Sequence, residues 1–232
     1  MQAAVTKTRS VSPAQISVVV PLGPGEPAPL DLLDHLGDER FERIVSAVDE
    51  APDALPTGVA WLSGPPGRGR QLNRGAQAAS APWLWFLHAD SVIERSTRRA
   101  VTRFCARDED AIGYCQLRYL ADGPWLSALN AAGANWRSRL LGLPYGDQGL
   151  CLPTRWFQRL GGFREDLDRG EDLDLVVRAS RSGLRTRRTG GRIHTSARRY
   201  RERGWLRTTL EHQVAAWRLV RNARRAARVD GP

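Results

Sequence analysis

An acidic segment near residue 170 contains the side chains best suited to accept a proton. Glu171, Asp172 and Asp174 stand at the expected start of a helix, shortly after the turn Gly161-Gly162-Phe163. The N-terminal end of a helix favours negative charge, so a carboxylate there stays ionised, as a general base requires. Neighbouring helical positions point in different directions, so only one of these acids can face a substrate. The alternative, acids placed only to suit the helix dipole, leaves the glycine turn unexplained.

Polar groups also follow three expected strands in the first half of the chain. Asp49 follows the second strand, where a surface turn is the alternative interpretation. Gly67-Arg68-Gly69-Arg70 follows the third, where glycines permit close backbone approach and guanidinium groups suit phosphate. His88-Ala89-Asp90 follows the fourth, where the acid could hold a divalent cation or a ribose, or could instead cap the next helix. Parallel sheets bind ligands beyond the carboxyl ends of their strands, so we expect these groups to line one site.

Short apolar runs predict the strands that position these groups. The run Trp83–Leu87 is wholly apolar, as a strand of a parallel sheet covered on both faces requires. Strands and helices alternate over the first hundred residues, and this pattern predicts an α/β fold with a mostly parallel sheet. The other expected strands are Ile16–Pro21, Arg43–Val48, Gly58–Leu62, Ala111–Tyr119, Gln148–Leu152 and Arg192–Thr195, with helices at about 30–37, 68–79, 124–141, 153–160 and from Glu171.

Length and composition predict one globular domain. The chain has 232 residues, of which 41% are hydrophobic and 26% charged, so it is neither fibrous nor wholly disordered. Its three cysteines form no zinc or disulfide pattern, which suits a reducing cytoplasm. No apolar run reaches 18 residues and no signal peptide is visible, so we expect a cytoplasmic protein.

The net charge of +10 comes from the last quarter of the chain. Residues 1–175 carry 19 basic and 22 acidic side chains, whereas residues 176–232 carry 16 and 3. Arginines surround one apolar helical stripe there, which predicts a basic amphipathic helix. Such a helix is a solvated face, a contact for a membrane or an anionic substrate, or a nucleic-acid patch. The stripe consists of Leu206, Leu210, Val214, Trp217 and Val220.

In combination, these motifs resemble those of the family 2 glycosyltransferases, which have the Rossmann-type GT-A fold. The resemblance extends from about residue 16 to about residue 207 and depends on the order of the motifs, because each alone is common. It is carried by Ile16–Pro21, Arg70, Asn73-Arg74-Gly75, Phe86–Asp90, Gly161–Phe163 and Glu171–Leu175. It is strongest to a branch that shares Pro65–Gly75, Leu87–Asp90, Gly146–Gln148 and Thr195–Arg199.

The resemblance implies inverting transfer of a sugar from a nucleoside-diphosphate sugar to an acceptor hydroxyl. Asp172 matches the catalytic base, Asp49 the contact to the nucleotide base, and Asp90 the last acid of the Asp-x-Asp element that binds Mn²⁺ or Mg²⁺. His88 replaces the first acid of that element, and imidazole suits Mn²⁺ better than Mg²⁺. Arg68 and Arg70 would neutralise the diphosphate. The remaining expected site residues are Asn73 on the donor side, and Asp147, Gln148, Glu171, Arg198 and Arg199 on the acceptor side or in support.

The resemblance also implies divisions of the chain and a setting for its acceptor. Acceptors in this family are often lipid-linked, and a basic helix would then contact the inner face of the membrane. The expected divisions are a flexible leader over residues 1–15, a GT-A-like domain over 16–203 and the basic helix over 204–232. Within the domain, a nucleotide-binding half covers about 16–110 and an acceptor half about 111–203.

Two loops depart from the family pattern and keep a second hypothesis open. Asp49–Ala54 contains no glycine where the family has a glycine-rich turn, and Pro21–Glu26 replaces Pro-x-x-Asn-Glu. The alternative is therefore a catalytically weak or inactive sugar-nucleotide-binding homologue that acts through a partner. A nucleic-acid-binding protein that uses residues 176–232 is a third hypothesis, and no nucleic-acid motif accompanies that charge.

Overall fold

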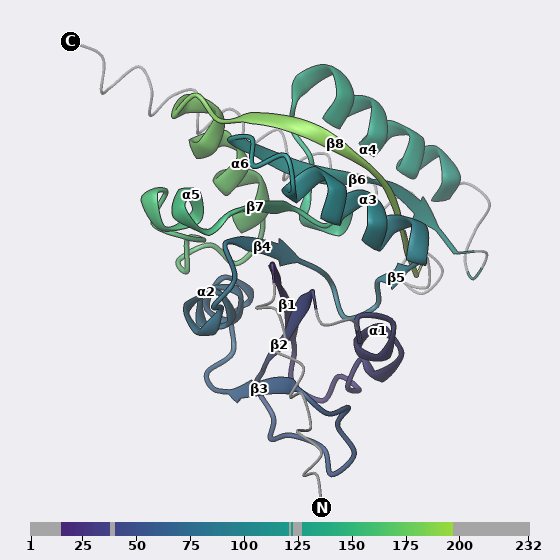
Figure 1. Cartoon of the computed structure of the whole chain (residues 1–232), viewed down its shortest axis with the longest axis vertical. Helices are drawn as coiled ribbons and strands as arrows, with labels where there is room; N and C mark the ends of the chain where they lie inside the picture. Colours follow the sequence, from purple (N-terminus) through teal and green to yellow (C-terminus); the bar gives the residue numbers. More distant parts are fainter. Residues whose placement is uncertain (1–14, 38–39, 121, 123–126, 197–232) are drawn as a thin grey trace, which may run out of the picture.

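One mixed sheet of eight strands organises the part of the chain that the computed structural model describes, namely residues 15–37, 40–120, 122 and 127–196 (Figure 1). The strand order is β3-β2-β1-β4-β7-β6-β8-β5. The first four strands in this order all run parallel, so their carboxyl ends meet at one edge. They are β1 (Ile16–Leu22), β2 (Phe41–Ala47), β3 (Val59–Ser63) and β4 (Trp83–Phe86).

The second half of the chain extends the same sheet through a short antiparallel strand. β7 (Cys151–Pro153) lies between β4 and β6 (Ala111–Tyr119) and is antiparallel to both. β8 (Arg185–Thr195) runs parallel to β6, and β5 (Val92–Ile93) pairs antiparallel with its end. The predicted α/β fold with a mostly parallel sheet is thereby confirmed.

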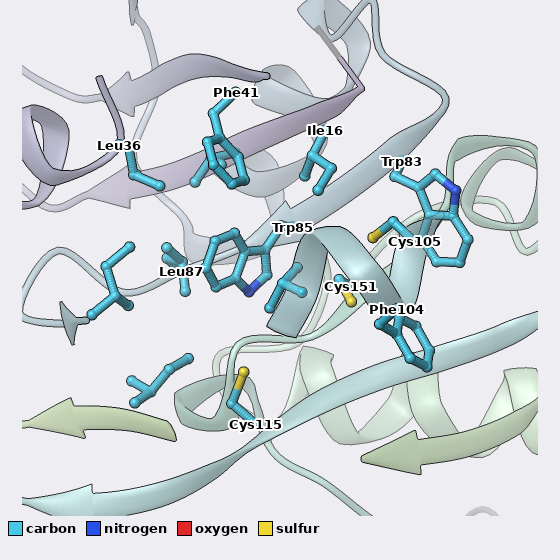
Figure 2. Close-up of a cluster of buried hydrophobic side chains, with 14 of the residues drawn as sticks. Ile16, Leu36, Phe41, Trp83, Trp85, Leu87, Phe104, Cys105, Cys115 and Cys151 are labelled. Carbon is cyan, nitrogen blue, oxygen red and sulfur yellow. The ribbon is translucent and has the colours of Figure 1, made fainter. Parts of the chain in front are cut away.

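Helices cover both faces of the sheet, which explains the wholly apolar strands. Trp83 and Trp85 of β4 pack with α1 (Leu30–His35) and α3 (Arg95–Cys105). Figure 2 shows both tryptophans in this buried cluster. Leu84 and Phe86 point to the opposite face, where they pack with α2 (Arg68–Ala78). All four side chains are buried, and such alternation buries a strand on both sides.

Two segments differ from the sequence prediction. β8 begins at Arg185, seven residues before the predicted strand, because its exposed arginines conceal the strand in the sequence. The predicted strand at Gln148–Leu152 instead starts at Cys151, after a 3₁₀ turn over Gly146–Gln148. Gly149 ends that turn with a φ of 61°, a left-handed conformation that breaks a strand.

Three more helices complete the described part. They are α4 (Ser127–Leu141), α5 (Thr154–Arg159) and α6 (Glu171–Arg181). The described residues contain no helix that is both long and apolar enough to cross a membrane. Residues 1–14 of the expected leader and the whole basic helix over 204–232 lie outside the described residues, and the division into two halves stays a prediction.

Candidate active site

Arg68 is the centre of a cluster at the carboxyl edge of β4. It is the first residue of α2, directly after Gly67, whose φ of 125° favours glycine. Its Nε lies 2.6 Å from Oε1 of Glu171, and its Nη2 lies 2.5 Å from Nε2 of His88. The guanidinium therefore joins the start of α2, the end of β4 and the start of α6, which are far apart in the sequence.

The protonation of His88 follows from this contact. A guanidinium group has only N–H donors, so Nε2 of the imidazole must accept and the ring is neutral, with its proton on Nδ1. The lone pair of Nε2 faces Arg68 and is not directed at a metal. In this structure His88 therefore contacts Arg68 through Nε2.

Asp172 lies on the other side of the same cluster. One of its oxygens accepts the backbone N–H of Gly146, and the other accepts the N–H of Leu173 at 2.7 Å. A Cβ atom added to Gly146 would lie 2.8 Å from Oδ2 of Asp172 and 3.2 Å from Nε2 of His88. Glycine is therefore required here for the backbone to approach the two side chains closely.

Each acid at the start of α6 has a different partner, as the helical directions predict. Glu171 is buried against Arg68, and the desolvation raises the pKa of its carboxyl, as does the nearby Asp172, while Arg68 lowers it. Asp174 instead binds Nε of Arg178 at 2.7 Å. Arg178 donates in turn to the carbonyl oxygens of Leu160 and Gly162. This ion pair ties the glycine turn to α6 and explains why the two motifs occur together.

The corner formed by Asp147, Asp172 and Asp90 suits a positive charge. Oδ1 of Asp147 is buried and has no hydrogen-bond partner among the described residues. Burial raises the pKa of Asp147 to about 6. The negative charges of Asp172 and Asp90 also raise this pKa, whereas the positive charges of Arg137 and Arg68 lower it. Asp90 follows β4 and accepts a hydrogen bond from Thr195 at 3.0 Å.

The carboxylate chemistry at this corner suits a divalent cation that takes most of its ligands from a bound phosphate. Carboxylate oxygens are suitable ligands for Mg²⁺ and Mn²⁺, and Oδ1 of Asp147 has no hydrogen-bond partner among the described residues. Among the residues that the structure describes, no group of three His, Cys, Asp or Glu side chains is arranged to hold a metal by itself. Asp90 is therefore the expected protein ligand, and His88 does not fit this role.

Four expected site residues bind elsewhere in the structure. Oδ2 of Asp49 accepts the N–H of Gly25 at 2.7 Å, which joins the loops after β2 and β1. Arg70 lies 3.5 Å from Glu165 at the surface. The amide of Asn73 donates to the carbonyl oxygen of Phe163 and accepts the N–H of the same residue. The buried Gln148 forms hydrogen bonds with Ser138, Tyr145 and Cys115. Arg198 and Arg199 lie outside the described residues.

Three residues beside the cluster were not predicted. Gly146 supplies the N–H for Asp172, although the sequence analysis noted only its motif. The guanidinium carbon of Arg137 lies 3.4 Å from the ring centroid of Tyr145, and Arg137 lowers the pKa of Asp147. The sequence does not distinguish Arg137 from the other 33 arginines, because its position beside Asp147 depends on how α4 packs.

Solved structures with a similar fold are glycosyltransferases. *S. aureus* TarS 1–349 in complex with UDP-GlcNAc has a TM-score of 0.59 and 15% identity, over 78% of this chain and 58% of that chain. The mannosyltransferase PcManGT from *Pyrobaculum calidifontis*, in complex with GDP-Man and Mn²⁺, has a TM-score of 0.56 and 16% identity, over 81% of this chain and 60% of that chain. The chain spans 37 to 61% of the length of the TarS chains that it matches. These likenesses show the GT-A fold.

Sequence comparison identifies the family. No curated protein sequence matches the chain. The sequence profile of the family described as "Glycosyltransferase like family 2" matches residues 38–226, which is most of the chain and includes every described residue of the Arg68 cluster. The chain therefore belongs to glycosyltransferase family 2.

Proposed function

We propose that this chain is an active glycosyltransferase that moves a sugar from a nucleoside-diphosphate sugar to an acceptor hydroxyl with inversion. The observation that supports this most strongly is the convergence of Arg68, His88 and Asp172 at the carboxyl edge of β4. Ligands of α/β sheets bind at this edge. The complexes of structural neighbours with UDP-GlcNAc and GDP-Man are consistent with such a donor.

The donor diphosphate would lie at the start of α2. Backbone N–H groups at a helix N-terminus bind anions, and the exposed Gly67 leaves the start of α2 open, whereas Gly69 is buried against the backbone of Arg164. The guanidinium of Arg68 is fixed by Glu171 and His88, so it is oriented before the donor binds. Arg70, in the first turn of α2, would contact the outer phosphate, and Asp49, two residues after β2, would contact the nucleoside.

Asp172 would act as the general base. Its carboxylate is held by Gly146 and Leu173, which fixes its direction while lone pairs on both oxygens remain. The acceptor oxygen would lose its proton to Asp172, form a bond to the anomeric carbon and displace the nucleoside diphosphate from the opposite face. This in-line arrangement inverts the anomeric carbon.

Charge grows on the leaving diphosphate during this step. Arg68 would bind part of it, and a divalent cation held by Asp90 would supply Lewis-acid neutralisation of the rest. The buried Oδ1 of Asp147, which has no hydrogen-bond partner among the described residues, supports the presence of that cation.

A thermal-shift screen of the full chain with UDP-, GDP-, dTDP- and CDP-sugars, with and without Mn²⁺, tests donor binding. A ligand at a hundredfold excess over its Kd stabilises the folded state by about 2.7 kcal/mol. Release of nucleoside diphosphate by the stabilising donor then tests transfer or hydrolysis, and NMR of the product reports the anomeric configuration.

The departures in Asp49–Ala54 favour the second hypothesis, a sugar-nucleotide-binding homologue of weak or no activity. The two hypotheses share donor binding and differ in turnover. Stabilisation by a donor without any release of nucleoside diphosphate, across a panel of acceptors, would support the second. No stabilisation by any donor would contradict both.

A further inference from the structure

A hollow in the second half of the sheet domain is lined mainly by arginines. Its volume is about 440 Å³, which is within the usual range of small-molecule sites. We call it the arginine hollow. Its lining comes from the segment just after α3, from β6, from the end of α4 and from the start of β8, and these elements lie at the end of the molecule away from β3 (Figure 1). The lining residues that could bind a ligand are Arg107, Tyr114, Arg139, Thr186, Arg187 and Arg188.

The hydroxyl of Tyr114 is available in the arginine hollow. The side chain of Tyr114 lines the hollow and is only 4% exposed. Within the described part of the chain, its hydroxyl forms no hydrogen bond. Burial raises the pKa of Tyr114, whereas the positive charges of Arg188 and Arg139 lower it. The phenol is therefore protonated at neutral pH, close to two guanidinium groups, and it can donate its O–H to a ligand.

Only one of the four arginines has a carboxylate partner among the described residues. Nε of Arg187 lies 3.6 Å from a carboxylate oxygen of Glu109. The amide oxygen of Gln116 lies 3.5 Å from Nη2 of Arg188 and carries no charge. The guanidinium groups that form no ion pair or hydrogen bond within the described residues are those of Arg107 and Arg139.

The elements around the arginine hollow supply no further negative charge. Neither α4 nor β8 contains an acidic residue. Asp108 and Asp110, on either side of Glu109, instead lie 3.3 and 2.8 Å from Arg155. Like charges that gather without counter-charges repel each other, and a bound anion would remove this repulsion.

The arginine hollow is separate from the candidate active site. Arg188 precedes Thr195 by seven residues in β8, and Thr195 is the residue that donates to Asp90. A strand rises by about 3.3 Å per residue, so roughly 20 Å of β8 separates Arg188 from the site at Asp90. A ligand in the hollow therefore does not depend on the proposed sugar transfer.

We propose that the arginine hollow binds a soluble anion that carries at least two phosphate groups. Guanidinium groups bind phosphate oxygens through paired N–H donors, and the O–H of Tyr114 would add a charge-assisted hydrogen bond. One phosphate group carries at most about two negative charges at neutral pH. The three arginines without a carboxylate partner therefore match a ligand with two phosphate groups better than a ligand with one.

Calorimetric titration of the full chain with sodium pyrophosphate in EDTA tests this site. We expect saturable binding, weaker binding of orthophosphate, and weaker binding of both as salt rises. The variant R139A/R188A should bind pyrophosphate at least tenfold less tightly, because it loses charge-assisted hydrogen bonds. The matched control R95A/R99A removes two exposed arginines of α3 and should stay within a few-fold of the parent. Absence of saturable binding, or an equal loss in the two double variants, would overturn the proposal.

Pyrophosphate resembles the diphosphate of the proposed donor, so the two sites must be told apart. We expect R139A/R188A to keep the thermal stabilisation by a nucleotide sugar that the parent shows. We expect Arg68→Gln to weaken donor binding and to keep pyrophosphate binding in the hollow. Pyrophosphate binding that is lost in Arg68→Gln and kept in R139A/R188A would place the anion in the donor site and refute the hollow.

The substitution Tyr114→Phe tests the hollow without removing a charge. The ring and its packing stay, while the O–H donor is lost, so we expect pyrophosphate to bind about tenfold less tightly with little change in the unfolding midpoint. Unchanged affinity would contradict the proposed site.

Chemical modification locates the bound anion on the parent chain. Phenylglyoxal modifies accessible arginines, and mass spectrometry of peptides gives the rate at each one. Pyrophosphate should slow the modification of Arg139 and Arg188 and leave Arg95 and Arg99 unchanged. Equal protection of the two pairs, or no protection of Arg139 and Arg188, would mean that the hollow does not hold the anion.

Discussion

Arg68 shows how a single side chain can organise the whole candidate site. It forms its ion pair with a glutamate that is almost completely buried, while the side chain of Arg68 itself is 36% exposed. Loss of either partner would leave the other without compensation, which usually costs more than the pair contributes. A double-mutant cycle with Arg68→Gln and Glu171→Gln would measure this coupling in donor binding.

The substitution Asp172→Asn should lower turnover by roughly 10²–10⁴-fold. The amide keeps the shape of the side chain and one acceptor oxygen for Gly146, but it cannot take a proton from the acceptor. Donor binding by thermal shift should change little. Asp166→Asn, at an exposed aspartate paired with Arg164, is the matched control and should retain turnover. Normal turnover of Asp172→Asn would contradict its role as the base, and loss of donor binding would indicate a structural role.

The substitution Asp147→Asn should change how stability depends on pH. The pKa of Asp147 rises from 3.8 to about 6 on folding, so between these values the folded chain holds a proton that the unfolded chain releases. Stability therefore falls as pH rises from about 4 to about 6 and stays lower above this range. The variant has no such titration, so its free energy of unfolding should rise relative to that of the parent across this pH range, by up to roughly 3 kcal/mol.

Urea unfolding in EDTA at pH 4, 5, 6 and 7 measures this difference, because EDTA removes any bound cation. Asp53→Asn, at an exposed position between β2 and β3, is the control. Its free energy of unfolding should not rise relative to that of the parent between pH 4 and pH 6. A constant difference between Asp147→Asn and the parent over the four pH values would contradict the expected protonation.

At the scale of elements, the 3₁₀ turn over Gly146–Gln148 connects the packing of α4 to the site. Gln148 is completely buried, and its amide oxygen accepts from Ser138 of α4 and from the N–H of Tyr145. Its amide nitrogen donates to Cys115 of β6. These bonds fix the turn, and the turn presents Gly146 to Asp172. The motif Gly-Asp-Gln thus positions the expected base rather than only lining the site.

The substitution Gly146→Ala should separate activity from stability. The added Cβ would lie 2.8 Å from Asp172 and 3.2 Å from His88, so Asp172 must move. We expect turnover to fall at least tenfold, since small displacements of a reacting group are costly, with a stability loss of about 1–3 kcal/mol. Gly133→Ala, in the middle of α4 with open space around it, should keep turnover and gain up to about 1 kcal/mol from helix propensity. Equal turnover of the two variants would contradict the expected geometry.

At the scale of the whole molecule, the sheet joins two differently built halves through β7. The parallel strands β1, β2, β3 and β4 carry the proposed donor side, and β6 and β8 form a second parallel pair. The cluster around Trp85 extends from β1 and β4 to β6, β7 and β8, as Figure 2 shows with Cys115 and Cys151 beside Trp85. Both halves therefore share one core, and we expect them to unfold together.

The three buried cysteines provide a test of this shared core. Burial raises the pKa of Cys115 to about 12 and raises the pKa of Cys151 well above its usual value, so neither forms a thiolate at pH 8. Cys105 is buried too. We expect a thiol reagent to modify all three at one slow rate, set by opening of the core. An exposed thiol introduced by Val92→Cys should react at once. Fast reaction of one native cysteine would show that its half opens separately.

The fold class, the family and the members of the Arg68 cluster that follow strands can be predicted from the sequence alone. Wholly apolar strands predict a sheet covered on both faces, and the carboxyl ends of parallel strands necessarily meet. The placement of Arg68, His88 and Asp90 after strands was therefore readable from local patterns. The separate directions of Glu171, Asp172 and Asp174 followed from helical geometry alone.

Which side chains are buried, and which charges lie close together, depends on the three-dimensional packing of the chain. The spacing of Leu129, Trp136 and Leu140 predicts an amphipathic helix but not that its apolar side faces outward, because the inner face is packed by alanine and asparagine. The high pKa of Asp147 arises from burial and from Asp172, 25 positions later. Burial and Coulomb interactions depend on distances in space, which spacing along the chain does not specify.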